Sequence, residues 1–294
     1  MTKKTDKIGL WLTDFDGTIK PSDPKAPISP EDLAALKRLG AEGWVRVVVT
    51  GRSLFSFATA WEPGLELDWL IFSSGSGLCP WNALGPGAVL EPRLFSPAEA
   101  ENALKTAVNL NFGFFAYLPP PDGHHFYYLK PPAMVPSGFN KRLKVFAVQA
   151  RPFPADYFDL APPARPALGQ LLLMIPKAEA VRVEAELAQR LPNLSRLDCA
   201  SPFDDNCRWL EVLPPGVSKG RAAAALAERL DLDRYRAVAL GNDHNDCDLL
   251  DWAGQAFVTR DAPPDLLARH ELIAPAGQGG LAQAVARVLD SHMI

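Results

Sequence analysis

The sequence predicts an α/β protein with a doubly wound parallel sheet and an inserted α/β domain. Short apolar runs rich in branched residues recur near both ends of the chain, and helical patterns separate them. Several runs end in clusters of polar or small residues, as buried strands do at the carboxyl edge of such a sheet. Between the two ends the pattern changes to aromatic and proline-rich segments. We therefore expect core residues at 1–78 and 208–294, and an inserted domain at 79–207.

The first predicted strand is Ile8–Thr13, and it delivers Asp14-Phe15-Asp16-Gly17-Thr18 at its end. Side chains two residues apart in an extended backbone point the same way, so Asp14 and Asp16 should project together. Gly17 then lets the chain turn sharply. Two converging carboxylates favour a hard cation such as Mg2+, although a surface turn after a strand is the plainer alternative.

The next elements continue the strand–helix alternation. Ser29 followed by Pro30 is a typical helix start, and Gly40 is the expected end of that helix. A second strand over residues 45–49 ends in Thr50-Gly51-Arg52. A third apolar run, Leu67–Phe72, ends in a Ser/Gly cluster in which Ser74-Gly75-Ser76 is interpreted as a hinge without a catalytic duty.

The inserted domain contains a capped helix near Ser96, a strand at Leu171–Ile175 and a helix at Ala178–Leu191. Its aromatic stretches are more typical of a packed core than of a sugar-stacking platform. Adjacent His124 and His125 are more typical of surface or packing positions than of metal ligands, with substrate contact as the alternative.

The core pattern is expected to resume with a strand at Trp209–Val212. Lys219 opens an alanine-rich helix, and the strand Ala237–Leu240 delivers Gly241-Asn242-Asp243-His244-Asn245-Asp246. The predicted sheet is completed by a helix at 248–252, a strand at 256–258 and a helix at 281–289.

Four polar clusters thus lie at strand ends or at the helix starts beside them, where an open α/β sheet binds its ligands. Asp14 can attack phosphorus, and Asp16 can move a proton to the leaving group and from water. The Thr50 hydroxyl, the Gly51 N–H and the Lys219 ammonium can hold phosphoryl oxygens. The acidic cluster at 242–246 can complete an oxygen-ligand metal site.

Together these clusters resemble the four motifs of the haloacid dehalogenase (HAD) superfamily, over residues 7–78 and 208–290. The inserted domain resembles, in position and size, the cap of the Cof-type (class IIB) phosphatases, which include sucrose-phosphate and mannosyl-3-phosphoglycerate phosphatases. The resemblance implies a nucleophile at Asp14, an acid/base at Asp16 whose main-chain carbonyl meets Mg2+, and phosphate contacts at Thr50 and Lys219. Gly51, Arg52 and Asn245 are further candidate substrate contacts. Arg52 is equally compatible with a solvated helix start.

The candidate metal ligands are Asp14, Asp16, Asn242, Asp243 and Asp246. The sequence departs from the family at Asn242, where the fourth motif usually has Asp. An Asn carbonyl can ligate Mg2+ without bringing charge, so we expect Asp243 to supply the carboxylate and Asp246 to be a ligand or a supporting partner. Which of the three touches the metal stays open.

The whole-chain numbers narrow the function classes. The chain has 294 residues, a net charge of −4 and a pI near 5.8, so it lacks the basic footprint of a nucleic-acid-binding protein. It has no apolar run long enough for a membrane span, and its four cysteines lack CxxC spacing. Taken with the motifs and the family resemblance, these numbers lead us to expect a cytoplasmic, Mg2+-dependent phosphomonoesterase acting on a small metabolite, such as a sugar phosphate. The alternatives are a phosphotransferase or phosphomutase, and a non-catalytic phospho-ligand-binding protein. The oligomeric state is not predicted.

Overall fold

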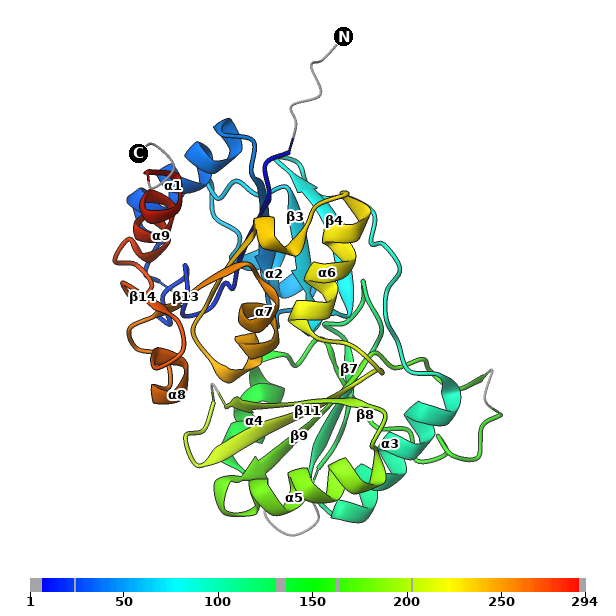
Figure 1. The fold of residues 1–294 in the computed structure, drawn as a ribbon. Helices are drawn as coiled ribbons and strands as arrows, with labels where there is room; N and C mark the ends of the chain where they lie inside the picture. Colours follow the sequence, from blue (N-terminus) through cyan, green and yellow to red (C-terminus); the bar gives the residue numbers. More distant parts are fainter. Residues whose placement is uncertain (1–6, 24, 131–135, 162–163, 202, 291–294) are drawn as a thin grey trace. The chain divides into compact units, whose positions relative to one another are not determined.

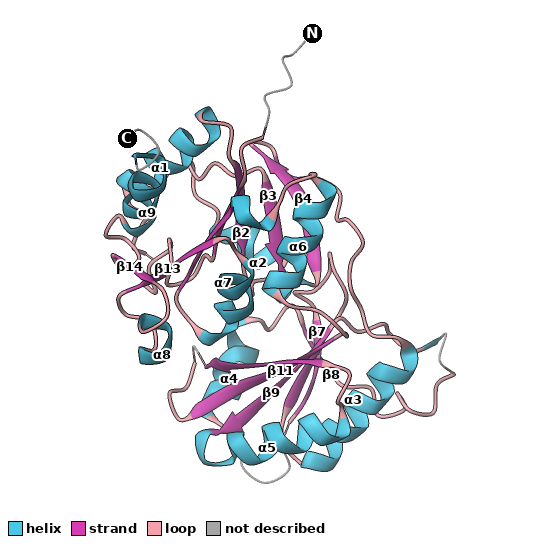
Figure 2. Ribbon diagram, viewed as in Figure 1, coloured by secondary structure: helices cyan, strands magenta, loops and turns pink. Residues whose placement is uncertain are grey.

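The computed structural model describes residues 7–23, 25–130, 136–161, 164–201 and 203–290, and its chain forms two compact units (Figures 1 and 2). Unit 1 comprises residues 1–52, 56–91 and 218–294, and unit 2 comprises residues 53–55 and 92–217. Each unit has its own sheet. The predicted α/β core interrupted by an inserted α/β domain is confirmed.

The sheet of unit 1 has eight strands, of which the first six in spatial order run parallel; the seventh pairs antiparallel with the sixth, and the eighth pairs antiparallel with the seventh. In spatial order they are β14 (Glu271–Ile273), β13 (Gln255–Thr259), β12 (Ala237–Gly241), β1 (Leu10–Thr13), β2 (Val45–Val49), β3 (Trp69–Phe72), β4 (Gly77–Asn82) and β5 (Gly85–Pro86).

Strand β1 lies between β12 and β2, with Leu10 opposite Ala237 on one side and Val45 on the other. Leu10 and Leu12 are fully buried against apolar residues of the helices on one face of the sheet. Both neighbours run parallel to β1, so the three strands end at the same edge of the sheet. The residues that follow β1 therefore emerge at the centre of the carboxyl edge.

Helices flank this sheet, and α1 packs against α9, as Figure 2 also shows. Ser29 caps α1 by accepting a hydrogen bond from the Asp32 N–H, as predicted. The helix runs one residue past Gly40, to Ala41. The helices of unit 1 are α1 (Pro30–Ala41), α2 (Leu54–Ala60), α6 (Lys219–Arg229), α7 (Cys247–Trp252), α8 (Pro264–Leu267) and α9 (Gly280–Asp290), with 3-10 turns η1 (Ser73–Gly75), η3 (Arg234–Arg236) and η4 (His244–Asp246).

The sheet of unit 2 has six strands, in the order β10 (Ser195–Ala200), β11 (Cys207–Leu213), β9 (Gln170–Pro176), β6 (Phe114–Tyr117), β7 (Phe126–Leu129) and β8 (Ala150–Pro152). Helices α3 (Pro97–Leu110) and α5 (Lys177–Arg190) pack with Phe114 on one face, and α4 (Ser137–Val145) packs with Phe115 on the other. Consecutive strand residues thus supply two separate apolar layers, because their side chains alternate between faces.

Two predicted boundaries are wrong. Residues 79–91 belong to unit 1, because β4 pairs with β3 and extends the core sheet. Residues 208–217 belong to unit 2, because β11 pairs with β9 and β10 there instead of with the core. An apolar strand pattern predicts that a strand is buried, but it does not predict which strand lies beside it. The assignment of residues 208–213 to the core sheet was wrong for this reason.

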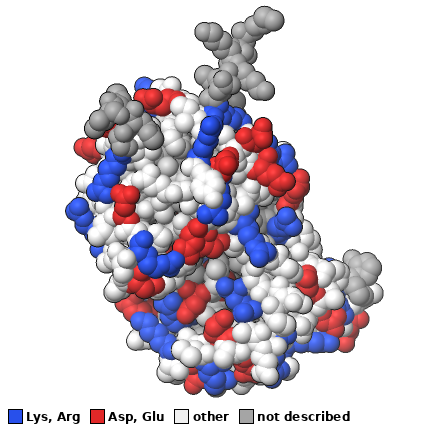
Figure 3. Space-filling model, viewed as in Figure 1, with Lys and Arg blue, Asp and Glu red and all other residues white. Residues whose placement is uncertain are grey.

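The described surface carries both signs of charge. On the face drawn in Figure 3, Lys and Arg side chains are interspersed with Asp and Glu. No helix among the described residues combines the length and the apolar character that a membrane span requires.

Candidate active site

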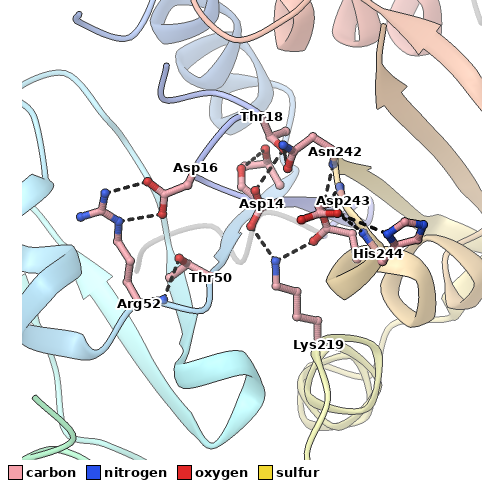
Figure 4. Close-up of polar contacts among 11 residues, drawn as sticks. Asp14, Asp16, Thr18, Thr50, Arg52, Lys219, Asn242, Asp243 and His244 are labelled. Atoms are coloured by element: carbon pink, nitrogen blue, oxygen red, sulfur yellow. Dashed lines mark hydrogen bonds and ion pairs between the residues drawn. The ribbon is translucent and has the colours of Figure 1, made fainter. Parts of the chain in front are cut away.

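The Asp14 side chain lies at the end of β1 and is buried, with 5% of the residue exposed. Its N–H donates to the Leu240 carbonyl of β12 at 2.9 Å, which fixes the main chain where the strand stops. One carboxylate oxygen, Oδ1, lies 2.6 Å from the Lys219 ammonium, and Oδ2 accepts from the Thr18 hydroxyl at 3.1 Å (Figure 4). The Asp14 carboxylate is therefore fixed by Lys219 and Thr18 and shielded from water.

Lys219 is the first residue of α6, and Ser218 caps that helix through the Arg221 N–H. The Lys219 ammonium lies 2.6 Å from Asp14 Oδ1 and 2.6 Å from Asp246 Oδ1, so one cation bridges two carboxylates. Burial alone would lower the pKa of Lys219, but the two carboxylates raise it above its usual value. The ammonium stays charged.

The sharing of one ammonium leaves Asp14 only partly compensated. Burial raises the pKa of the Asp14 carboxyl to about 7, because Lys219 offsets only part of the desolvation and the Asp246 charge adds to it. The Asp14–Lys219–Asp246 cluster thus carries excess negative charge when both carboxyls are ionised. This excess negative charge would attract a further cation.

Asp246 is fully buried and organises the loop after β12. Its Oδ2 accepts from the main-chain N–H groups of Asn242 and Asp243 at 2.9 and 3.2 Å, while Oδ1 contacts Lys219. Both oxygens are therefore engaged. Asp246 thus holds both the loop and the Lys219 ammonium, and whether it also contacts a metal stays a prediction.

Asn242 lies beside Gly17 and Thr18. The Thr18 hydroxyl is 3.1 Å from Asp14 Oδ2 and 3.2 Å from Asn242 Oδ1, and it can donate to one of them at a time. Gly17 has a φ of +79°, and a Cβ there would come within 2.3 Å of the Asn242 amide nitrogen. Glycine is therefore required for Asn242 to lie this close to the Asp14 loop.

Asp243 has a different environment. Its Oδ1 accepts from the His244 N–H at 2.7 Å, so the side chain caps the short turn η4. The His244 ring contacts Asp265 at 3.1 Å and holds the same loop toward α8. The expectation that Asp243 supplies the metal carboxylate stays a prediction. Asn245 contributes a buried Oδ1 without a hydrogen-bond partner among the described residues.

Asp16 does not project beside Asp14 as predicted. Its two carboxylate oxygens accept from Arg52 Nε and Nη2 at 2.7 and 2.6 Å, while Asp14 faces Lys219 (Figure 4). The extended backbone ends at Asp14, because the chain folds into a tight loop in which Asp16 forms a bridge with Lys20. Arg52 therefore pairs with Asp16, an arrangement that neither interpretation of Arg52 from the sequence included.

Thr50 and Gly51 lie between β2 and Arg52. The buried Thr50 hydroxyl accepts from the Arg52 N–H at 3.1 Å, which forms a turn. The Ser73 and Ser74 N–H groups donate to the carbonyls of Arg52 and Thr50 at 2.8 and 3.1 Å. The predicted hinge thus supports the Thr50–Arg52 turn directly.

That support has an unusual backbone. Ser73, Ser74 and Gly75 have φ values of +49°, +55° and +102°, and a Cβ at Gly75 would lie 2.4 Å from the Ser218 carbonyl. Consecutive left-handed residues that are not glycine are uncommon and strained. The strained turn therefore joins the Thr50 loop to the start of the Lys219 helix. The only sequence signal was a run of small residues after a buried strand.

Comparison with known proteins identifies the family of this chain. A family model described as haloacid dehalogenase-like hydrolase matches residues 11–285. An HMP-PP phosphatase of Citrobacter koseri is 27% identical over 270 residues, covering 88% of this chain and 86% of the relative. An HMP-PP phosphatase of Cronobacter sakazakii is 36% identical over 86 residues, covering 29% of this chain and 30% of the relative.

Solved structures share the fold. A phosphatase of the haloalkanoate (HAD) superfamily from Bacteroides thetaiotaomicron superposes with a TM-score of 0.75 at 16% identity, covering 98% of this chain and 97% of its own. A HAD subclass IIB sugar phosphatase superposes with a TM-score of 0.68 at 15% identity, covering 95% of this chain and 98% of its own. The resemblance inferred from the motifs is confirmed, and the chain belongs to the haloacid dehalogenase-like hydrolases.

Proposed function

We propose that this hydrolase is a phosphatase that cleaves a phosphate monoester of a small metabolite through an aspartyl-phosphate on Asp14. The observation that carries the proposal is the buried Asp14–Lys219–Asp246 cluster at the carboxyl edge of the sheet. A carboxylate held beside an ammonium in a water-poor site is suited to attack an anionic phosphoryl group. The names of the full-length relative and of the sugar phosphatase support the same reaction class.

In the first half-reaction an Asp14 oxygen forms a bond to phosphorus while the bond from phosphorus to the ester oxygen breaks. Asp16 donates a proton to that departing oxygen, which leaves as an alcohol. In the second half-reaction water attacks the phosphorus of the aspartyl-phosphate and gives its proton to Asp16. Phosphate departs, and both Asp14 and Asp16 return to their starting states.

The transferring phosphoryl group needs donors around its oxygens. Lys219 supplies a fixed positive charge, and the Thr50 hydroxyl and the Gly51 N–H supply neutral donors at the neighbouring strand end. Asn245 is proposed as a further substrate contact through its amide. Arg52 reaches the substrate only if it leaves Asp16.

The residues also fit a hard cation. Among the described residues no group of three or more His, Cys, Asp or Glu side chains has an arrangement that could hold a metal ion. The fit instead rests on mixed oxygen donors next to the undercompensated Asp14: the Asp14 carboxylate, the Asp16 main-chain carbonyl and the Asn242 amide oxygen, with Asp243 nearby in the chain. We propose Mg2+ at these residues, where it would neutralise charge on the phosphoryl group. Asp246 is proposed to support this site by holding the Lys219 ammonium and the Asn242 main chain in place.

The proposed substrate class is a small phosphorylated metabolite, with a sugar phosphate as the first candidate because a subclass IIB sugar phosphatase shares the fold. Transfer to an acceptor sugar would use the same core residues, so only the products distinguish a mutase from a hydrolase. The cytoplasmic location stays a prediction.

The proposal is tested by assaying a panel of phosphate monoesters with Mg2+, using the wild type and Asp14→Asn. We expect the wild type to release inorganic phosphate and the variant to be slower by at least about 10³-fold, because the nucleophile is lost. Asp290→Asn, on the exposed end of α9, is the matched control and should match the wild type. Phosphate release by Asp14→Asn at the wild-type rate, or an isomerised sugar phosphate as the product, would overturn the proposal.

A further inference from the structure

A second ion pair lies on the loop that carries Asp16. The Lys20 ammonium is buried, donates to the Ala26 carbonyl at 2.7 Å and forms an ion pair with Glu62. The other Glu62 oxygen accepts from the Ile28 N–H at 3.1 Å. Burial acts to raise the pKa of Glu62, but the hydrogen bonds from Lys20 and Ile28 outweigh it and keep that pKa below its usual value. Both Glu62 oxygens therefore accept hydrogen bonds, and the Lys20 side chain contacts the Ala26 carbonyl as well as Glu62.

The main chain of Lys20 is tied to that of Asp16. The Gly17 N–H donates to the Lys20 carbonyl at 2.8 Å, the Lys20 N–H donates to the Phe15 carbonyl at 2.9 Å, and Asp16 and Lys20 form a β-bridge. The loop is thus closed on itself from Phe15 to Lys20. Fixing the Lys20 side chain fixes the position of the Asp16 main chain, because only a few bonds separate them.

Two ion pairs of opposite polarity join the same two segments. Asp16 is the negatively charged member of its pair with Arg52, whereas Lys20 is the positively charged member of its pair with Glu62. Arg52 precedes helix α2 in the chain and Glu62 follows it, so the Asp16 loop contacts residues near both ends of that helix. The two contacts prevent the loop from turning about either one.

The two pairs differ in their exposure to water. The side chains of Asp16 and Arg52 are 48% and 30% exposed, but those of Lys20 and Glu62 are only 8% and 24% exposed. Exposed pairs contribute little to stability, whereas removing one partner of a buried pair leaves an uncompensated charge. The Asp16–Arg52 pair is the more exposed of the two, so we expect Asp16 to leave Arg52 more readily than Lys20 leaves Glu62.

We propose that Lys20 and Glu62 are positioning residues that hold the Asp16 loop while the Asp16 carboxyl exchanges Arg52 for the leaving group. The inference rests on the proposed function, which makes Asp16 the proton donor. A misplaced donor affects departure of a poor leaving group far more than departure of a good one, because a stable anion leaves without a proton. Leaving-group dependence therefore distinguishes positioning of Asp16 from general damage.

The experiment measures kcat/KM for phenyl phosphate and 4-nitrophenyl phosphate, with Mg2+, in the wild type, Lys20→Met and Glu62→Gln. We expect kcat/KM for phenyl phosphate to fall about 10-fold or more, and that for 4-nitrophenyl phosphate to fall less than about 3-fold. Lys20→Arg should restore most of the loss. Arg38→Met, which breaks an exposed ion pair with Asp290, is the control and should change neither value.

Equal losses on both esters, or no loss on either, would overturn the positioning role. If Lys20→Met does not fold, Glu62→Gln provides the test, because glutamine keeps the side-chain shape of Glu62 and one hydrogen-bond acceptor. Asp16→Asn separates the two proposals. If this variant lowers kcat/KM equally for both esters, the assignment of Asp16 as proton donor fails. If it lowers kcat/KM mainly for phenyl phosphate, but the Lys20 and Glu62 variants do not, only the positioning role fails.

Discussion

The two units each surround a cation, and they do so with opposite kinds of partner. In unit 1 the Lys219 ammonium lies between two carboxylates at 2.6 Å each. In unit 2 the Arg142 guanidinium lies 4.6 to 6.0 Å from six ring centroids and donates to the Tyr117 hydroxyl. Those rings belong to Phe115, Tyr117, Phe126, Phe146, Phe203 and Trp209.

The difference separates chemistry from packing. Carboxylates beside Lys219 carry full charges that can attack, bind a metal or accept a proton. Aromatic faces around Arg142 attract a cation through their quadrupoles but offer no reactive atom. We therefore expect substitutions of Lys219 to remove activity, and substitutions of Arg142 to lower stability with little effect on activity.

The sharpest test of this contrast is Lys219→Met. The variant leaves Asp14 and Asp246 facing each other without a counter-charge, so we expect kcat/KM to fall by about 10² to 10³-fold. Breaking a buried pair should also cost about 3 to 5 kcal/mol of unfolding free energy. Steady-state kinetics and urea denaturation measure the two effects. A variant with normal kcat/KM would place the chemistry elsewhere.

The second prediction concerns pH. The folded-state pKa of Asp14 is raised from 3.8 to about 7, so ionising this buried carboxyl destabilises the folded protein as pH rises through that range. Asp14→Asn removes the cost. Its gain in unfolding free energy should be small near pH 4, grow toward pH 7 and level off above it, at on the order of 2 to 4 kcal/mol.

Urea denaturation in EDTA at pH 4.5 and 8 measures this gain. Added Mg2+ should raise the melting temperature of the wild type more than that of the variant, because Asp14 is a proposed ligand. A gain that is equal at the two pH values would show that the Asp14 carboxyl is already compensated by Lys219.

For the aromatic side of the comparison, Arg142→Met should lower the unfolding free energy by about 1 to 2 kcal/mol. We expect kcat for 4-nitrophenyl phosphate to change less than about 2-fold. Lys144→Met, on the exposed side of the same helix, is the control and should leave both quantities unchanged. A large loss of kcat with normal stability would instead give Arg142 a part in the reaction.

The smallest expected effect concerns the strained turn beside Lys219. Ser73→Gly should raise the unfolding free energy by about 0.5 to 1 kcal/mol, because glycine adopts a positive φ without strain. Ser76→Gly is the matched control: Ser76 has a φ of −72°, so the change should lower stability. Thermal melts compare the two. The opposite ranking would mean that the Ser73 hydroxyl contributes more than its backbone costs.

Local patterns predicted much of the fold and part of the site. The run that ends at Asp14, the Ser29 cap and Lys219 at a helix start depend on residues close in the sequence, and the structure contains each. The Asp16–Arg52 pair was missed because it depends on how the chain folds after Asp14. The Arg142 cluster was missed because its rings come from five separate segments, and no regular spacing in the sequence relates these segments.

The position of β1 between β2 and β12 also governs the order in which the protein can be built on the ribosome. Its partner on one side is synthesised soon after it, but β12 begins only at Ala237. Until then one edge of an apolar strand has unpaired main-chain groups, a known route to aggregation. Residues 92–217 can complete their own sheet during this interval. Asp14 and Lys219, which are 205 residues apart, therefore meet only late in synthesis.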